Sequence, residues 1–308
     1  MRDIHHVTVL VNPASANENG HKIWLQLQPH FEEAWRGHEI QVIETTSREQ
    51  EMELARTIRT DLLVSLSGDG TVNDLTQGLM IRPEAERPVL AVIPIGSGND
   101  IAKALGFPMN PWSAISRLPR AQRTHIDLGS VNGRYFLNTL SFGVDAAISD
   151  RTHELRKSTR RRGFILYGQA AVTAVFKDLK PHHYRLQIDN EFQERDLLIC
   201  AIQNGPYYGG GFKIAPHALL DDNQLDICLA SEVSTLKALF YLARIARGSH
   251  EKLKHIETRR ARQIILETDE RIAAQCDGES IQGLPTAAGG WHYEIQLWPQ
   301  ALEVASMR

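Results

Sequence analysis

The feature that most constrains the fold is a strand followed by a glycine-bearing loop and a helix, a pattern that occurs twice early in the chain. Apolar runs at Leu62–Leu66 and Val89–Ile95 each have the length of a buried strand, and each precedes a polar loop with two glycines. Further strand candidates lie at Ile4–Val11 and Glu39–Glu44. Strands that alternate with helices pair in parallel, because a crossover helix carries the chain back to the same end of the sheet. Residues 1–125 therefore predict a doubly wound α/β domain.

The pattern changes after Asp127, where short strands separated by turns predominate. Helices are expected only at Phe164–Lys177 and Ser234–Arg247, and Gly248 suits the position after the second. The expected strands are Tyr135–Leu140, Tyr184–Asp189, Glu191–Ile202, Leu225–Ala230, Arg262–Thr268, Arg271–Cys276 and His292–Trp298. Many strands with few helices indicate an antiparallel β-sandwich or barrel. We expect a second domain at residues 126–308, whose last strand can return to the first domain.

Composition excludes several classes of protein. At 308 residues the chain is long enough for two domains. No apolar run approaches the ~20 residues that a membrane span needs, and no signal-peptide pattern is visible at the N-terminus. Three cysteines without a CxxC pair argue against a disulfide framework or a structural zinc. We therefore expect a cytoplasmic protein.

Charge is distributed unevenly along the chain. The net charge is only −3, yet Arg151–Arg162 holds six basic residues and one acidic residue. The apolar stretch Gly163–Tyr167 follows directly, and a basic segment before an apolar one suits an anionic membrane surface. A solvated charged helix is the alternative for this block. The pattern favours a reversible, peripheral membrane association and does not indicate a nucleic-acid-binding protein.

The two glycine loops are typical of phosphate binding. Gly68 and Gly70 flank Asp69, and Gly96 and Gly98 flank Ser97. Residues without a β-carbon let backbone amides approach a phosphate, and the following helix N-termini add partial positive charge. Thr71 and Ser97 offer hydroxyl donors. Tight turns are the alternative for the glycines, and neither a Walker A loop nor a dinucleotide fingerprint is present.

Asp69 is unexpected in a loop that binds phosphate, because its charge opposes that of the ligand. A divalent cation between the two would remove the conflict. We therefore predict that Asp69 binds Mg²⁺ directly or through water. A cap on the helix that follows is the alternative.

Several motifs together resemble the diacylglycerol kinase catalytic-domain family. They are Ser67–Asp74, Pro94–Asp100, Ile126–Gly129, Phe142–Ala146 and Cys276–Glu279. Within that family the chain is similar to the small bacterial soluble lipid kinases, which also resemble sphingosine kinases. The resemblance implies an α/β nucleotide domain joined to a β-sandwich, with the active site in the cleft between them.

The resemblance also implies roles for individual residues. Asp277 matches the catalytic base, and Asp69, Asp127 and Glu279 match an acidic group tied to the catalytic Mg²⁺. The positions that match the ATP site are Asn12, Pro13, Ser15, Thr45, Thr46, Gly68, Asp69, Gly70, Thr71, Asn73, Gly96, Ser97, Gly98 and Asn99. The chain departs from the family at Ser67 and at Ala16, where glycine is usual.

A separate structural Mg²⁺ is implied in the loop at residues 215–224. Its ligands would be the Leu219 carbonyl, the Asp222 carboxylate and the Gln224 carbonyl. An ordinary Asx turn at Asp222 is the alternative. Asp145 lies near the position where related sphingosine kinases recognise the acceptor head group.

The predicted function is an ATP-dependent lipid kinase of phospholipid metabolism, which transfers the γ-phosphoryl group to a hydroxyl of a diacylglycerol-like acceptor. The S-G-D-G-T loop also resembles NAD kinases and phosphofructokinases, so a soluble small-molecule kinase is one alternative. A nucleotide-binding regulator without turnover is another. The identity of the lipid, and whether the chain forms a homodimer, stay open.

Overall fold

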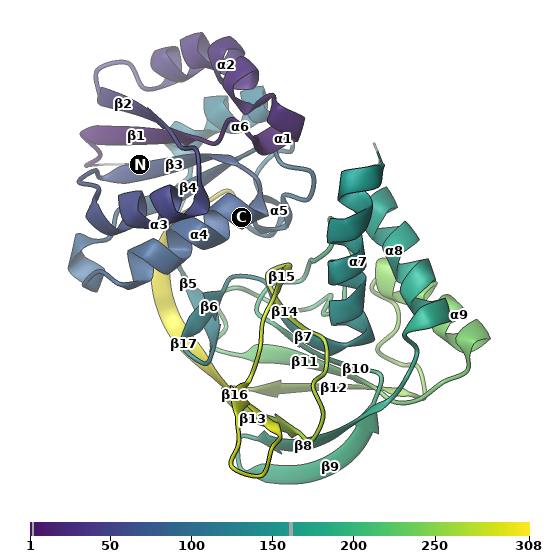
Figure 1. The fold of residues 1–308 in the computed structure, drawn as a ribbon. Helices are drawn as coiled ribbons and strands as arrows, with labels where there is room; N and C mark the ends of the chain where they lie inside the picture. The colour runs from purple at the N-terminus through teal and green to yellow at the C-terminus, as the bar shows by residue number, and fades with distance from the viewer. Residues whose placement is uncertain (2, 160–162) are drawn as a thin grey trace. The chain divides into compact units, whose positions relative to one another are not determined.

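The computed structural model describes residues 1, 3–159 and 163–308 (Figure 1). The chain divides into two compact units, Met1–Ile126 with Gln300–Arg308, and Asp127–Pro299. Two strands, β5 (Gln122–Val131) and β17 (Trp291–Ser306), carry the chain from one unit into the other. Among the described residues, no helix has the length and apolar character that a membrane crossing needs.

The first unit contains a parallel sheet with the order β2-β1-β3-β4. Its strands are β1 (His6–Val11), β2 (Glu39–Glu44), β3 (Leu62–Ser67) and β4 (Val89–Pro94). Every residue of β3 and β4 is buried, as the apolar runs predict. The end of β17 pairs in parallel with β4.

Helices cover both faces of this sheet. They are α1 (Ser15–Glu18), α2 (Gly20–Ala34), α3 (Arg48–Thr57), α4 (Asp69–Met80), α5 (Asp100–Ala104) and α6 (Pro111–Arg117). Helix α2 packs with α6 on one face, and α3 packs with α4 on the other (Figure 1). The Ser47 hydroxyl accepts a bond from the Gln50 amide and thereby caps the N-terminus of α3. The unit is the expected doubly wound α/β domain.

The second unit is a sandwich of two sheets. One is an antiparallel sheet with the order β12-β11-β10-β7-β14-β15. Its strands are β7 (Thr139–Gly143), β10 (Ile199–Gln203), β11 (Leu225–Ala230), β12 (Ile256–Ala261), β14 (Ala274–Cys276) and β15 (Glu279–Ser280). The other contains β6 (Arg134–Phe136), β8 (His182–Ile188), β9 (Glu191–Leu197), β13 (Gln263–Thr268), β16 (Leu284–Pro285) and the first part of β17. A buried core that includes Phe142, Leu186, Ile227 and Ile295 fills the space between them.

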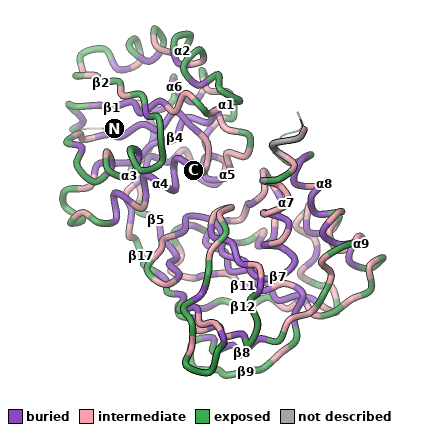
Figure 2. The backbone as a smooth tube through the Cα atoms, viewed as in Figure 1, coloured by how far each residue is buried: buried purple, intermediate pink, exposed green. Residues whose placement is uncertain are grey.

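Three helices cover the outer face of the six-stranded sheet. They are α7 (Val144–Ser158), α8 (Gly163–Lys177) and α9 (Thr235–Ala246). A second core joins them to the sheet, with Ile148 and Ala170 packed in one cluster with Ala201 and Cys228. Figure 2 shows β7 and β11 mostly buried and the helices partly exposed. The predicted helices α8 and α9 are confirmed, whereas α7 and β12 were not predicted.

Residues 160–162, which hold three of the six basic residues of the block at Arg151–Arg162, lie outside the described residues. Of its basic side chains, the structure describes Arg151, which forms a bidentate ion pair with Asp178 at 2.6 and 2.8 Å. The charge of Arg151 is therefore already paired within the protein.

Candidate functional site

The loops that carry the predicted ATP-binding residues meet where the strand order of the first unit reverses. The chain leaves β1 toward β2 on one side, and β3 lies on the other side of β1. In open α/β sheets such a reversal opens a crevice outside the carboxyl ends of the strands. Asn12 follows β1, Gly68 follows β3, and Gly96 lies two residues after β4.

The two glycine loops touch through their backbones. A β-carbon at Gly96 would lie 2.4 Å from the Cα atom of Gly68, so no larger residue fits there without displacing the neighbouring loop. A β-carbon at Gly70 would instead meet nothing within 4 Å. Open space therefore lies beside Gly70, next to the close contact of the two loops, and a phosphate that approaches backbone amides needs such space.

Asp69 connects these loops. It is the first residue of α4, and its Oδ1 atom accepts a hydrogen bond of 3.2 Å from the Ile101 amide in the first turn of α5. It thus caps the helix after the second glycine loop. A carboxylate at this position has the donor chemistry for Mg²⁺, which proteins bind through one or two carboxylates together with substrate phosphates.

The structure identifies one central residue that the sequence analysis missed. Glu51 on α3 is only 2% exposed, and its Oε1 atom accepts bonds from Asn12 Nδ2 (2.9 Å), Thr45 Oγ1 (2.9 Å) and Thr71 Oγ1 (3.4 Å). Burial raises the pKa of Glu51, and the Thr45 bond opposes that shift. Glu51 therefore joins three of the predicted ATP-binding residues. In the sequence it is one of several acidic residues on a charged helix, which gave no signal of its burial.

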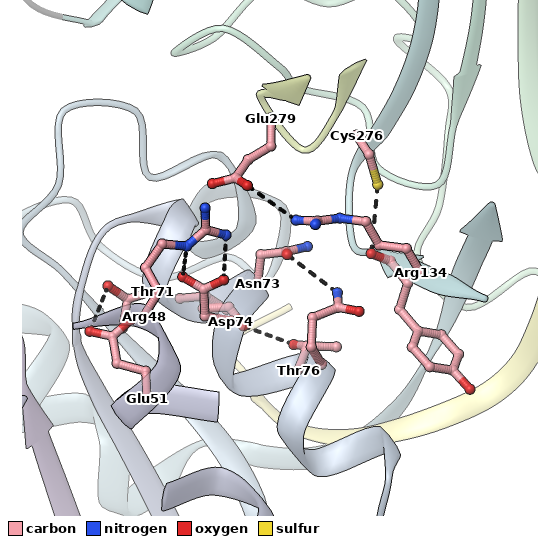
Figure 3. A network of polar contacts seen from close by, with 12 residues as sticks. Arg48, Glu51, Thr71, Asn73, Asp74, Thr76, Arg134, Cys276 and Glu279 are labelled. Atoms are coloured by element: carbon pink, nitrogen blue, oxygen red, sulfur yellow. Dashed lines mark hydrogen bonds and ion pairs between the residues drawn. The ribbon is translucent and has the colours of Figure 1, made fainter. Parts of the chain in front are cut away.

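Further contacts fix the same edge of the sheet. Asn12 also donates to Thr71 Oγ1 at 2.9 Å. The guanidinium of Arg48 forms two bonds of 2.9 and 2.6 Å with the buried Asp74 carboxylate (Figure 3). These contacts hold α3 and α4 against the end of β1.

The remaining predicted residues of the ATP site differ in their surroundings. Thr46 is exposed and bonds to Gln50, and Ser97 is exposed. Asn73 is buried and accepts from Gln77. Asn99 adopts a left-handed conformation and donates to the Gly96 carbonyl, while its buried Oδ1 atom has no partner among the described residues. Pro13, Ser15 and Gly98 are half-buried loop residues.

The turn after β1 shows why glycine would suit position 16. Ala16 has φ 55° and ψ 39°, and Asn17 and Glu18 are also left-handed. A left-handed alanine costs roughly 1–2 kcal/mol, because its β-carbon crowds the following carbonyl. The departure from glycine is therefore a strained substitution in a turn that keeps its left-handed conformation.

In the second unit, Asp277 occupies the turn between β14 and β15. Asp277 and Gly278 both have positive φ, 47° and 87°, as a two-residue hairpin turn of type I′ requires. The Asp277 carboxylate accepts bonds from the backbone amides of residues 137, 138 and 139 at 2.7, 3.0 and 2.9 Å. These three donors satisfy the charged form of the carboxylate and fix its orientation.

The other acidic residues of the predicted catalytic group have separate partners. Glu279 accepts from Arg134 Nη2 at 3.3 Å (Figure 3). Asp127 is fully buried and accepts a 2.7 Å bond from the Asn223 amide. Asp69 belongs to the first unit, and the other three belong to the second.

The loop predicted to hold a structural Mg²⁺ makes its own contacts. Asp222 Oδ1 accepts from the Gln224 amide at 3.2 Å, which is the Asx turn that was the alternative, and Arg260 lies 3.7 Å from the same carboxylate. Leu219 is half-exposed. Across the described part of the chain, no three His, Cys, Asp or Glu side chains converge on a metal position. The contacts of Asp222 do not require a cation, and the structural Mg²⁺ stays a prediction.

A further buried carboxyl group lies at the start of α7. The Oδ1 atom of Asp145 accepts from Tyr208 (2.6 Å) and Tyr167 (3.0 Å), while its Oδ2 atom has no partner among the described residues. Burial raises the pKa of Asp145, and the nearby hydroxyl groups of Ser141, Tyr208 and Tyr167 oppose the shift. An acceptor without a partner at complete burial points to a polar ligand or water at this position.

Comparison with known sequences identifies relatives along both units. The profile described as "Diacylglycerol kinase catalytic domain" matches residues 6–131. The profile described as "YegS C-terminal NAD kinase beta sandwich-like domain" matches residues 138–306, more than half of the chain.

Individual proteins extend this similarity. A diacylglycerol kinase of Bacillus subtilis is 27% identical over 276 residues, 88% of each chain. A "probable lipid kinase YegS-like" protein of Chromohalobacter salexigens is 28% identical over 217 residues, 70% of this chain and 69% of the relative. A crystal structure of a diacylglycerol kinase from Bacillus anthracis shares the fold, with a TM-score of 0.75, 21% identity and coverage of 99% and 98% of the two chains.

Proposed function

The chain belongs to the family that joins a diacylglycerol kinase catalytic domain to a YegS-type C-terminal domain, and on this premise we propose that it transfers the γ-phosphoryl group of ATP to a hydroxyl group of a diacylglycerol-like lipid. The observation that carries the proposal is the open space beside Gly70, next to the backbone contact between Gly68 and Gly96, at the strand reversal. Kinase relatives of similar length support the lipid acceptor.

In the proposed reaction the first unit binds the nucleotide. Amides of the two glycine loops and the N-terminus of α4 would bind the phosphates. Mg²⁺, held by Asp69, would neutralise charge on the transferring group. The Glu51 network would keep Asn12 and Thr71 oriented toward the nucleotide, because it engages both side chains.

In the same proposal the second unit activates the acceptor. Asp277 would take the proton of the lipid hydroxyl while the hydroxyl oxygen attacks the γ-phosphorus and ADP leaves. The three backbone amides support this role by holding the carboxylate in one orientation. Asp127 and Glu279 would complete the acidic group around the metal.

Asp145 is proposed to bind the polar head of the acceptor. Its support is a buried Oδ2 atom without a partner among the described residues, next to two tyrosine hydroxyls. A lipid acceptor resides in a bilayer, so the proposal includes an anionic membrane surface as the place of reaction.

The decisive experiment supplies radiolabelled ATP with parallel acceptors. Diacylglycerol, phosphatidylglycerol, ceramide and sphingosine are compared with NAD and a sugar phosphate. Label in a lipid product supports the proposal. Label only in a soluble product would replace it with the small-molecule kinase, and nucleotide binding without turnover would replace it with the regulator.

A glycine variant tests the cradle itself. In Gly70→Ala the new methyl group meets no protein atom within 4 Å, so we expect unchanged thermal stability but a KM for ATP raised about tenfold or more, if phosphate occupies that space. Gly96→Ala is the contrasting variant, because its methyl group would lie 2.4 Å from the Gly68 Cα atom, and we expect it to lower stability as well. An unchanged KM for ATP in Gly70→Ala would show that the phosphate of ATP does not bind beside Gly70.

A further inference from the structure

Two neighbouring helices of the second unit expose apolar side chains that no described contact explains. On α8, Ile165 is 67% exposed and Phe176 is 65% exposed. On α9, Leu236 is 81% exposed and Phe240 is 54% exposed. Single exposed apolar residues are ordinary, but several on adjacent elements indicate a binding surface.

The exposed residues form a stripe along each helix. On α8, positions 172 and 176 lie seven and eleven residues after position 165, so all three are on one side of the helix. On α9, positions 236 and 240 are four residues apart and also share one side. The opposite side of α9 is buried through Ala238 and Ile245. Helices α8 and α9 also contact each other, so the two stripes lie on adjacent helices. Figure 2 shows exposed segments along both helices.

The charged residues of the same two helices indicate what kind of partner would bind there. Neither α8 nor α9 contains an Asp or Glu, and their charged residues are Lys177, Lys237 and Arg244. An apolar stripe on helices whose own charged residues are all basic matches the anionic head groups and acyl chains of a lipid leaflet.

We propose that the α8–α9 face, defined by Ile165, Val172, Phe176, Leu236 and Phe240, is the surface that docks on an anionic bilayer. The inference rests on the proposed function, because a lipid acceptor must be reached in its membrane. It adds α9, about 70 residues beyond the basic block in the sequence, to the membrane-facing surface.

The test is flotation of the intact protein with vesicles of phosphatidylglycerol and phosphatidylcholine, at low and high salt and without ATP. The double variant Leu236→Ser/Phe240→Ser removes one leucine and one phenylalanine from the proposed face. The matched control Leu25→Ser/Phe192→Ser removes the same residue types from exposed positions on α2 and β9, 55% and 66% exposed. We expect the bound-to-free ratio of the first variant to fall about tenfold, and that of the control to change by less than about twofold.

Three results would overturn the proposed surface. One is equal binding of the wild type to purely zwitterionic vesicles at all salt concentrations, and another is flotation of the double variant at the wild-type level. The third is a wild-type dimer, seen by sedimentation, that the double variant dissociates while vesicle binding is absent; the face would then belong to a second copy of the chain. Ser substitutions at exposed positions keep the helices folded, which circular dichroism verifies.

Phosphorylation of a short-chain diacylglycerol in detergent separates this inference from the proposed function. Normal activity on that acceptor together with lost vesicle binding in the double variant supports the surface. Normal wild-type flotation without phosphorylation of any lipid would overturn the function and leave the surface standing. If the wild type phosphorylated a lipid but did not float with vesicles, the proposed surface would be overturned and the proposed function would stand.

Discussion

At the residue scale, Asp277 has a structural role and a proposed catalytic role, and a substitution can be used to measure the two separately. Its carboxylate is a structural acceptor for three backbone amides and the proposed base. In Asp277→Asn the amide group offers one acceptor oxygen, and its NH2 group faces a backbone donor. We expect kcat to fall by orders of magnitude, with the KM for ATP largely unchanged, because the nucleotide contacts proposed above belong to the first unit.

The same variant should also lose stability, by about 1–3 kcal/mol for an unsatisfied buried group. Urea unfolding and calorimetric ATP binding measure that loss apart from the chemistry. Turnover near the wild-type level would refute the assignment of Asp277 as the base.

Asp145 predicts a pH dependence of stability. Burial raises the pKa of this carboxyl group above its usual 3.8, so folding favours the protonated form. The stabilising contribution is complete below the ordinary pKa and is lost as the pH rises through the raised pKa of the folded state. In Asp145→Asn the group no longer titrates, and the carbonyl oxygen can still accept from Tyr167 and Tyr208.

We therefore expect the stability of Asp145→Asn relative to the wild type to rise as the pH increases above about 4. Urea unfolding at a series of pH values measures the difference. Parallel pH profiles for the two proteins would contradict this account of the buried carboxyl group.

At the scale of secondary-structure elements, Glu51 links α3 to the end of β1 and to the start of α4. Glu51→Ala would leave Asn12, Thr45 and Thr71 without their shared acceptor. We expect a loss of about 1–3 kcal/mol in unfolding free energy and a raised KM for ATP, with a smaller effect on kcat.

Glu53→Ala is the matched control for this variant. Glu53 lies on the same helix, is exposed, and pairs with Arg56 at 3.6 Å. An exposed pair of this kind contributes at most about 1 kcal/mol, so stability and KM should stay near the wild-type values. Equal behaviour of the two variants would mean that the Glu51 network does not position the nucleotide loops.

At the scale of the whole molecule, the chain returns to the first unit at its end. Residues 300–308 belong to that unit, with Leu302 and Val304 buried, Val304 paired with Leu90, and Glu303 bonded twice to Arg123 at 2.7 Å. Burying each of these two apolar side chains contributes about 1.5–3 kcal/mol. Deletion of residues 300–308 should therefore destabilise the first unit more than the second.

Hydrogen exchange measured on peptides from each unit tests this prediction. We expect faster exchange in β3 and β4 of the truncated protein, and weaker ATP binding, while β10 and β11 keep their protection. The single variant Leu302→Ala should give the same pattern with a loss of about 2–5 kcal/mol. Uniform acceleration in both units would show that the two unfold together.

Local sequence signals determined much of this protein. The buried runs of β3 and β4, the capping Ser47 and the two glycine loops are encoded in a few adjacent residues, because strand burial, helix capping and backbone freedom are local properties. The Asp277–Gly278 pair likewise specifies its hairpin turn.

Tertiary structure alone decided what surrounds those residues. Glu51 gains its burial from Asn12 and Thr71, which lie 39 and 20 residues away, and the carboxylate of Asp277 is held by amides about 140 residues earlier in the chain. The exposed stripe of α9 could not be inferred either, because the sequence of an apolar helix does not show whether the side that faces away from the core is covered or exposed. Burial and hydrogen bonding between distant segments depend on how strands pair across the sheet, and no local pattern records that pairing.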